Sequence, residues 1–281
     1  MRVSASMLGV WMTCPLQARF QYVDQLPREI NAKTAFGSCI HHALHVYNTT
    51  NDVEEAVKEF RRVWNEPESI GAAFTYWPKY TSFGGLMNAG CEILREYDAK
   101  LQWEKRRVLG TEHKFLVPFG AHEITGFVDL LETKKSKRGI ETLRVIDYKS
   151  HSKQPFSPQL RVNIQFTAYV YASMQPEFWL GNGPDFPAMP NGEFYWETHK
   201  DMPRRAIWYH LMTNKEVDAG DRDDNDFMRL YRVACEVERA LDHEVFVPNI
   251  SGDSCTFCSY TDPCGLHIPT EEELRDQETA F

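Results

Sequence analysis

The N-terminal third of the chain spaces its apolar side chains with the period of a helix. The clearest case spans 52–64, where one helical face collects Val53, Ala56, Val57, Phe60 and Val63. Helices are also predicted over 34–47 and 86–101, and shorter ones over 4–13 and 16–23 on either side of Pro15. Residues 65–82, rich in aromatics, proline and glycine, are predicted to be irregular.

The middle of the chain changes to the pattern of strands. Strands are predicted over 108–118, 123–131 and 143–150, with the polar run 133–139 as the tip of a hairpin. Further elements follow: a helix over 158–174, strands over 194–197 and 206–212, and a helix over 227–240. This order predicts an α/β protein with a mixed β-sheet flanked by helices.

One domain is predicted to span 1–268, followed by an acidic, disordered tail over 269–281. The chain has 281 residues, of which 42% are hydrophobic, enough to bury one large core or two small ones. No apolar run approaches the ~18 residues of a membrane span, so no membrane partner is expected. The short apolar run 7–12 does not resemble a secretory signal, and seven cysteines without one favour a reducing, cytoplasmic setting.

The net charge of −9 argues against a general nucleic-acid coat, because phosphate contacts favour a basic surface. Basic residues nevertheless cluster at 105–107, 134–138 and 204–205, so a local groove could be basic on an acidic molecule. For any one of these clusters, a solvated turn or helix face is an equally good interpretation.

Four cysteines are placed as if to join the two ends of the chain. Cys14 stands alone, whereas Cys255, Cys258 and Cys264 form a C-x2-C-x5-C cluster. Thiolates at such spacing typically hold an iron–sulfur cluster or a closed zinc site. The other interpretation is a set of free or disulfide-bonded cysteines, which the turn-forming residues around the cluster make less attractive.

Two carboxylates and a lysine fall on neighbouring predicted strands. Asp147 and Lys149 share one face of their strand with apolar Val145, which places the site near a strand end or edge. A hairpin centred near Arg138 would set Asp129 opposite Asp147, where two like charges repel unless a cation such as Mg²⁺ or Mn²⁺ bridges them. A surface hairpin with an Asp147–Lys149 salt bridge is the equally weighted structural interpretation.

Two further groups share helical faces. Gln165 and Tyr169 are four residues apart, immediately after the strand that carries Asp147, and are suited to binding a phosphate or stacking a base. A partly buried tyrosine with a glutamine at the rim is the commoner arrangement. His41 and His45 have the spacing of two metal ligands, while His42 and His45 also fit ordinary helical histidines.

Together these residues resemble the RecB-type nucleases of the PD-(D/E)xK superfamily. The family pattern is matched in order by Gly37…His41 (G-x3-H), Gly126…Asp129 (G-x-x-D), Asp147-Tyr148-Lys149 ((D/E)-x-K) and Gln165…Tyr169 (Q-x3-Y). One N-terminal and three C-terminal cysteines further resemble the iron–sulfur subgroup, which includes AddB nuclease domains and CRISPR-associated exonucleases. The resemblance implies a restriction-endonuclease-like core closed by an iron–sulfur clasp between the N- and C-terminal segments.

The resemblance also implies a role for each matched residue. His41, Asp129, Asp147 and the main-chain carbonyl of Tyr148 would bind the divalent metal ion, and Lys149 would act on the attacking water. Gln165 and Tyr169 would support the site and contact DNA. A [4Fe–4S] cluster would be bound by Cys14, Cys255, Cys258 and Cys264. Glu112, on the strand before the hairpin, is a further candidate acid near the site. Position 147 is aspartate where many relatives carry glutamate, and both residues can bind a hard metal ion.

The expected function is a Mg²⁺- or Mn²⁺-dependent DNA exonuclease that acts on single-stranded ends in recombination, repair or DNA processing. No G-x4-G-K-[ST] motif is present, so unwinding would require a helicase or recombination partner. Two alternatives remain: a non-catalytic module that binds DNA ends, and a zinc-stabilised endonuclease.

Overall fold

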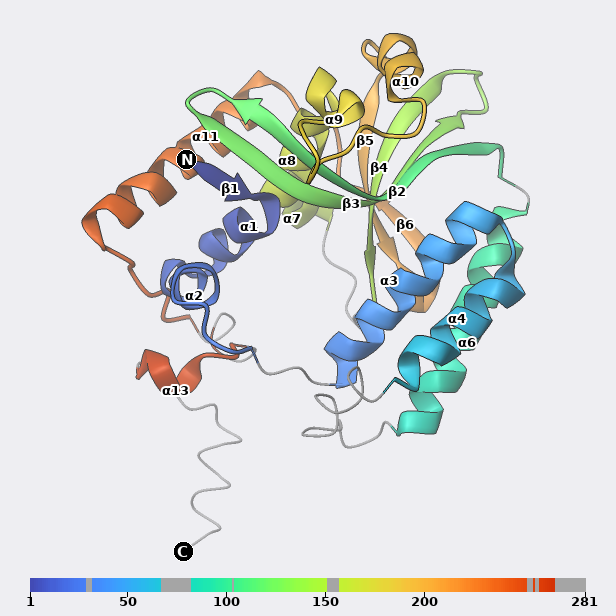
Figure 1. The fold of residues 1–281 in the computed structure, drawn as a ribbon, viewed down its shortest axis with the longest axis horizontal. Coiled ribbons are helices and arrows are strands. Elements are labelled where there is room, and N and C mark those ends of the chain that lie inside the picture. The colour runs from blue at the N-terminus through green and yellow to red at the C-terminus, as the bar shows by residue number, and fades with distance from the viewer. Residues whose placement is uncertain are drawn as a thin grey trace, which may run out of the picture.

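A mixed β-sheet forms the centre of the molecule and helices cover both of its faces (Figure 1). The computed structural model describes residues 1–28, 32–66, 82–102, 104–150, 157–251, 255 and 258–265. Within these residues the sheet has six strands: β1 (Arg2–Ser4), β2 (Arg106–Phe119), β3 (His122–Lys135), β4 (Glu141–Lys149), β5 (Arg204–His210) and β6 (Lys215–Asp218). β1 runs parallel to β3 and β4 parallel to β5, while the other pairs are antiparallel.

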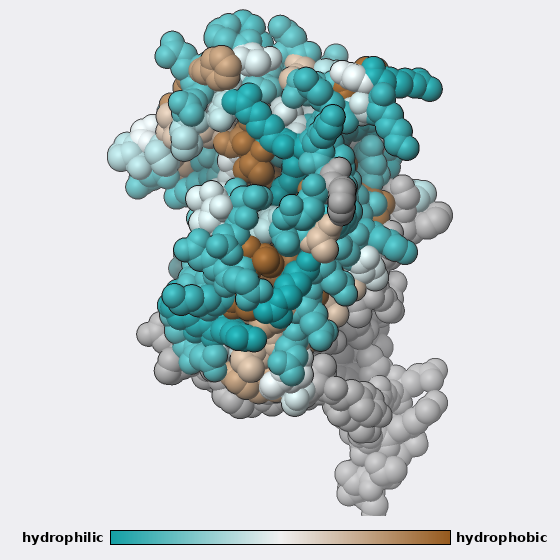
Figure 2. All heavy atoms as spheres, turned by 90° about the vertical axis from the view of Figure 1, so that its right-hand side faces the viewer, coloured by the Kyte–Doolittle hydropathy of each residue, from teal (hydrophilic) through white to brown (hydrophobic). Residues whose placement is uncertain are grey.

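One face of the sheet is covered by three long helices: α3 (Ala32–Thr50), α4 (Val53–Trp64) and α6 (Phe83–Leu101). They pack on side chains that β3 and β4 direct to this face, including Leu130, Ile146 and Tyr148. Asp52 caps α4 by accepting hydrogen bonds from the amides of Glu54 and Glu55. Figure 2 shows this side of the molecule, where hydrophilic residues predominate. The apolar faces of the helices pack inward on the sheet.

The other face is covered by helices from both halves of the chain. They include α1 (Ala5–Thr13), α8 (Ile164–Ser173), α9 (Pro176–Leu180) and α11 (Asp224–His243), which pack on Val128, Leu131 and Val145. Shorter segments complete the chain: α2 (Pro15–Ala18), η1 (Arg19–Val23), α7 (Ser157–Arg161), α10 (Gly192–His199), η3 (Leu211–Thr213) and α13 (Thr261–Cys264). The two apolar clusters sandwich the sheet, so its centre is buried on both faces.

The predicted mixed sheet and most predicted helices are confirmed, but one predicted strand is wrong. Residues 194–197 belong to the helix α10, in which Gly192, Tyr195 and His199 are buried at helical spacing. The aromatic run had indicated a strand, but burial at every third or fourth position stabilises a helix instead. β6 and α9 were not predicted, and the helix expected over 158–174 is divided between α7 and α8. Most of the irregular segment 65–82 and the whole tail 269–281 lie outside the described residues.

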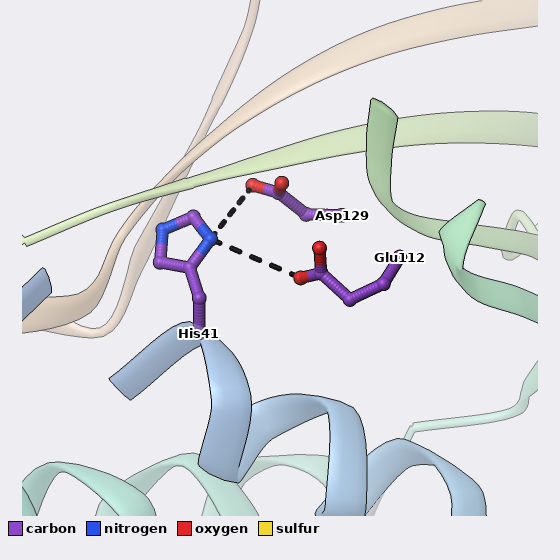
Figure 3. Close-up of side chains that lie close together, drawn as sticks. All are labelled: His41, Glu112 and Asp129. Atoms are coloured by element: carbon purple, nitrogen blue, oxygen red, sulfur yellow. Dashed lines mark ion pairs between the residues drawn. The ribbon is translucent and has the colours of Figure 1, made fainter. Parts of the chain in front are cut away.

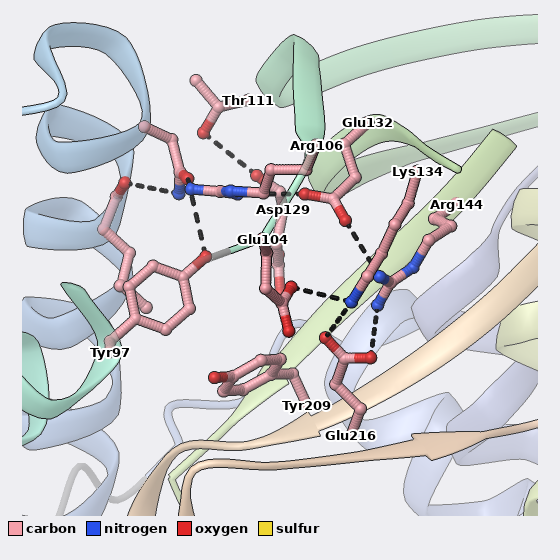
Figure 4. A network of polar contacts seen from close by, with 12 residues as sticks. Tyr97, Glu104, Arg106, Thr111, Asp129, Glu132, Lys134, Arg144, Tyr209 and Glu216 are labelled. Atoms are coloured by element: carbon pink, nitrogen blue, oxygen red, sulfur yellow. Dashed lines mark hydrogen bonds and ion pairs between the residues drawn. The ribbon is translucent and has the colours of Figure 1, made fainter. Parts of the chain in front are cut away.

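A buried ionic network ties the strands together at one end of the sheet (Figure 4). Glu132 on β3 pairs with Arg106 on β2 at 2.9 Å and with Arg144 on β4 at 3.2 Å. Arg144 also contacts Glu216 on β6 at 2.7 Å, and Lys134 contacts both Glu216 and Glu104. Two of the predicted basic clusters therefore supply Arg106 and Lys134 to structural ion pairs, and these residues do not form a basic groove.

We expect Glu132→Gln to lower the free energy of unfolding by about 3–5 kcal/mol, because it leaves two buried arginines without their shared carboxylate. Glu132 has 2% of its side chain exposed. The matched control is Glu123→Gln, which removes an exposed partner of Arg2 and should cost at most about 1 kcal/mol. Chemical denaturation measures both values, and equal losses would show that burial does not set the strength of this network.

Candidate active site

The candidate site lies in the middle of the β2–β3 hairpin, where both strands depart from regular geometry. Glu112, in the middle of β2, has a φ of 49°, a left-handed conformation that is rare for a residue with a side chain. On β3, Val128 and Leu130 would share one face of a regular strand, yet they pack into the apolar clusters on opposite faces of the sheet. Asp129 lies between them, and Glu112 lies between the residues of β2 that pair with them. The local departure from regular strand geometry therefore coincides with two acidic residues.

His41 on α3 approaches both of these carboxylates (Figure 3). Its Nδ1 atom lies 3.5 Å from Oδ2 of Asp129 and 4.0 Å from Oε1 of Glu112. One donor atom from each of the three residues falls within 4.8 Å of the others. A metal ion with bonds of about 2.0–2.2 Å holds neighbouring ligand atoms roughly 3 Å apart, so small side-chain movements would suffice to bind one.

Hydrogen bonds to the backbone of Tyr148 orient two of these groups. His41 Nε2 lies 3.0 Å from the Tyr148 carbonyl, and an N–H at this position leaves the Nδ1 lone pair directed at the carboxylates. The Tyr148 amide in turn donates to Oδ2 of Asp129 at 2.7 Å. The Tyr148 carbonyl, predicted as a metal ligand, thus orients His41 here, and its second lone pair remains available.

Asp147 and Lys149 occupy the end of β4, beside this group. The pairing of β3 and β4 has the predicted register, with Leu130 opposite Ile146, and the ladder ends one residue before Asp129 and Asp147. Lys149 Nζ lies 2.6 Å from Oδ2 of Asp147, so the salt bridge that was the alternative interpretation of these two residues is present. It is not a surface pair, because Asp147 is only 3% exposed, although the Lys149 side chain is 28% exposed.

The electrostatics of the site favour a cation. Burial, together with the charges of Asp129 and Asp147, raises the pKa of Glu112 to about 7. Burial also raises the pKa of Asp147, against the attraction of Lys149. For His41, burial acts to lower the pKa, but the hydrogen bond and charge of Asp129 outweigh it, so the pKa is raised. Crowded carboxylates that hold protons are typical of a site that exchanges them for a divalent ion.

We expect divalent-metal affinity to increase by up to about tenfold per pH unit between pH 6 and 7 and to level off above, since Glu112 must lose its proton. The sign follows from the raised pKa: below about 7 the carboxyl group is protonated and metal binding must displace a proton. Deprotonation of His41 acts in the same direction. Mn²⁺ titrations of the wild type and of Glu112→Gln at several pH values measure the effect; an unchanged profile in the variant would exclude Glu112 as its source.

Two glycines of the sequence motifs allow close approaches next to the site. A Cβ atom at Gly37 on α3 would lie 3.0 Å from Ser150 Oγ, at the end of β4. A Cβ atom at Gly126 on β3 would lie 2.8 Å from the ring of Phe115 and 3.3 Å from that of Tyr169. The absence of side chains at these positions lets α3 and Tyr169 lie close to the strands that carry the acids.

Gln165 and Tyr169 lie on α8, as their spacing predicted. Gln165 Nε2 donates to the Tyr169 hydroxyl at 2.6 Å. Tyr169 is only 4% exposed and packs edge-on against Phe115, and the charges of Asp147 and Asp129 contribute to its raised pKa after burial itself. This burial favours the supporting role for Tyr169 and leaves its ring little surface for stacking a base.

The other two histidines are not part of the three-residue group. His42 Nε2 lies 2.9 Å from Oε1 of Glu59. His42 and His45 instead line a groove of about 550 Å³ that also contains His41 and Glu112. Burial, followed by the charge of His42, lowers the pKa of His45. The groove opens beside the candidate metal ligands His41 and Glu112.

The structure brings Glu112 closer to His41 than the sequence could indicate. Glu112 belongs to none of the four motifs, and only its place on the strand before the hairpin suggested it as a further acid. It also has a left-handed backbone in the middle of β2, a conformation for which a glutamate gives no sequence signal.

The four motif cysteines come together at one pocket. Cys14, Cys255, Cys258 and Cys264 all line it, and none of them forms a disulfide. Burial raises the pKa of Cys258, and the other three thiols raise it further, as expected for sulfur atoms crowded together. The Asn249 amide donates to Cys14 Sγ at 3.4 Å, which fixes the C-terminal segment against the end of α1. Free, partly exposed thiols from both ends of the chain form a suitable donor set for a metal centre.

This arrangement of acids, a histidine and a lysine at a strand end defines a candidate metal-dependent hydrolase. A family model described as the PD-(D/E)XK nuclease superfamily matches residues 2–265. The chain therefore belongs to the PD-(D/E)XK nuclease superfamily, whose members are generally metal-dependent nucleases.

Other comparisons add little. No curated protein matches the chain. A solved structure described as "Crystal structure of SSO0001" is 10% identical in sequence and matches with a TM-score of 0.40. The match covers 95% of this chain and 87% of the chain in that structure. Among the described helices, none is both long and apolar enough to cross a membrane.

Proposed function

We propose that the protein is a Mg²⁺- or Mn²⁺-dependent DNA exonuclease that acts on single-stranded ends. The observation that carries this proposal is the convergence of His41, Asp129 and Glu112 within 4.8 Å, beside the ion pair of the buried Asp147 with Lys149. Acids and a lysine in this order belong to the superfamily motif, and the groove along α3 leaves room for a nucleic-acid strand.

His41, Asp129 and Asp147 would hold the divalent ion, with Glu112 as a further donor. When bound, the ion would polarise the scissile phosphate and favour ionisation of a water molecule. Lys149 would orient this water and stabilise negative charge on a phosphoryl oxygen, because its pKa is raised by Asp147 and Asp129 against the effect of burial. Asp147 would hold the Lys149 ammonium at the strand end, and Tyr148 would keep His41 in the required orientation.

Digestion of linear and circular single-stranded DNA of equal length tests the exonuclease assignment. With Mg²⁺ or Mn²⁺ the linear form should be degraded progressively from an end, while the circle remains intact. Cleavage of the circle would favour an endonuclease, and binding of ends without cleavage in either metal would favour the non-catalytic module.

We further propose that Cys14, Cys255, Cys258 and Cys264 bind a [4Fe–4S] cluster. The supporting observation is a donor set of four thiols that matches the cluster's usual ligands. Its role would be structural, joining the end of α1 to the segment after α11. A brown, anaerobically purified protein with about four iron atoms per chain and absorbance near 400 nm is expected. A colourless protein with one zinc atom would identify a zinc site instead.

The biological setting belongs to the same proposal. Recombination, repair or processing of DNA, with a helicase or recombination protein to supply single strands, would fit an exonuclease that has no P-loop of its own.

A further inference from the structure

One aromatic side chain stands exposed in an otherwise buried stretch of the active-site strand. Phe127 on β3 is 52% exposed, whereas the next residues along the strand, Val128 to Leu131, are at most 8% exposed. Its position is two residues before Asp129, so the two Cα atoms are roughly 7 Å apart along the strand. Burying this ring would be favourable, and no described element covers it.

A lysine lies beside this ring. Lys114 on β2 is the cross-strand partner of Phe127, and its Nζ atom lies 5.9 Å from the centre of the Phe127 ring. It also lies 4.5 Å from the ring of Phe186, which is buried. Among the described residues Lys114 forms no ion pair with a carboxylate, so the two rings hold an ammonium whose charge is not neutralised.

Phe127 and Lys114 lie on the same side of the sheet as the candidate metal ligands. Val128 and His113 contact the opposite side, where Val128 joins the cluster under α1 and α8, and His113 contacts Phe178 of α9. Because neighbouring side chains alternate, Phe127 and Lys114 face the side covered by α3, which carries His41. Lys114 is two residues from Glu112, just as Phe127 is two residues from Asp129.

We propose that Phe127 and Lys114 form a nucleotide-binding subsite next to the metal site, in which a base stacks on Phe127 and Lys114 contacts a phosphate of the same strand. This inference rests on the proposed nuclease function and assigns a source for its single-strand preference. A base can stack on an aromatic ring only when it has left its own duplex stack, so the subsite favours single-stranded over paired DNA. Lys114 supplies positive charge beside the ring, on a chain whose net charge is −9.

Binding of fluorescent oligonucleotides tests the subsite without requiring cleavage. The measurement uses the Asp147→Asn protein with Mg²⁺, with and without Phe127→Ala, and compares a single strand with a blunt duplex. Phe127→Ala should weaken single-strand binding by roughly 5- to 150-fold and change duplex binding much less. Phe194→Ala on α10 is the matched control, because Phe194 is similarly exposed at 57%, and it should have no effect.

Lys114→Met gives an independent readout. It should weaken single-strand binding and reduce the slope of log affinity against log salt concentration by about 0.7, the value for one phosphate contact. Equal losses for single strand and duplex in Phe127→Ala, or an unchanged salt slope in Lys114→Met, would overturn the subsite. If the wild type fails to cleave while these binding effects are present, the nuclease function fails but the subsite stands; if no oligonucleotide binds, the subsite itself is wrong.

Discussion

The Asp147→Asn protein is expected to lose DNA cleavage by on the order of 10³-fold or more, because it would lack one proposed charged metal ligand and the carboxylate that pairs with Lys149. Its fold should remain intact. The pKa of Asp147 is raised in the folded protein, which means that burial disfavours the charged carboxylate. A neutral amide of the same shape avoids this penalty, which offsets the loss of the ion pair with Lys149, so the thermal unfolding temperature should change little.

Single-turnover digestion of an end-labelled oligonucleotide measures the loss, and circular dichroism melting serves as the structural control. Asp185→Asn, in the loop between α9 and α10, is a matched substitution away from the site and should leave cleavage unchanged. If Asp147→Asn retained more than about a tenth of the wild-type rate, it would remove Asp147 from the catalytic group, since losing one such interaction typically costs 10²–10³-fold.

The second large effect is expected from Cys258→Ser. Removing one proposed ligand should release the cluster and lower the stability by at least about 4 kcal/mol, because the proposed cluster would join segments separated by more than two hundred residues of chain. Cleavage should fall as well. α1 packs against α8, and α8 carries Gln165 and Tyr169, so a loosened first helix would disturb the support of the site.

Three measurements test this prediction. Absorbance near 400 nm reports the cluster, denaturant unfolding reports the stability, and digestion of DNA reports the activity. Cys235→Ser is the matched control, because Cys235 is also partly exposed and free but lies outside the cysteine pocket. It should keep the absorbance and the activity. A Cys258→Ser protein that lost its cluster yet kept full stability and cleavage would contradict the structural role.

The parts of the site that could be predicted are those fixed by local periodicity. The register of β3 and β4 followed from the position of the hairpin tip, and it places Leu130 opposite Ile146. The pairing of Gln165 with Tyr169 followed from helical spacing. Both depend on residues close together in the sequence, where strand and helix geometry leaves few choices.

The remaining features depend on tertiary contacts that the sequence does not encode locally. Glu112 approaches His41 from a strand whose backbone is left-handed at that residue, and Asp129, just beyond the β3–β4 ladder, accepts a hydrogen bond from the Tyr148 amide. The choice of His41 over its neighbours likewise depends on which helical face meets the sheet. The strand predicted at 194–197 was wrong because aromatic residues suit either element until their burial pattern is known.

The most direct test of a metal-dependent nuclease is cleavage by the wild-type protein after complete removal of divalent ions. An end-labelled single strand is incubated with the chelated protein, and Mn²⁺ is then added in steps. We expect no cleavage before addition, recovery that follows Mn²⁺ occupancy, and no recovery in a parallel Asp129→Asn sample that still binds the oligonucleotide. Cleavage that continues after chelation, or equal recovery in Asp129→Asn, would contradict a metal site built on His41, Asp129 and Asp147.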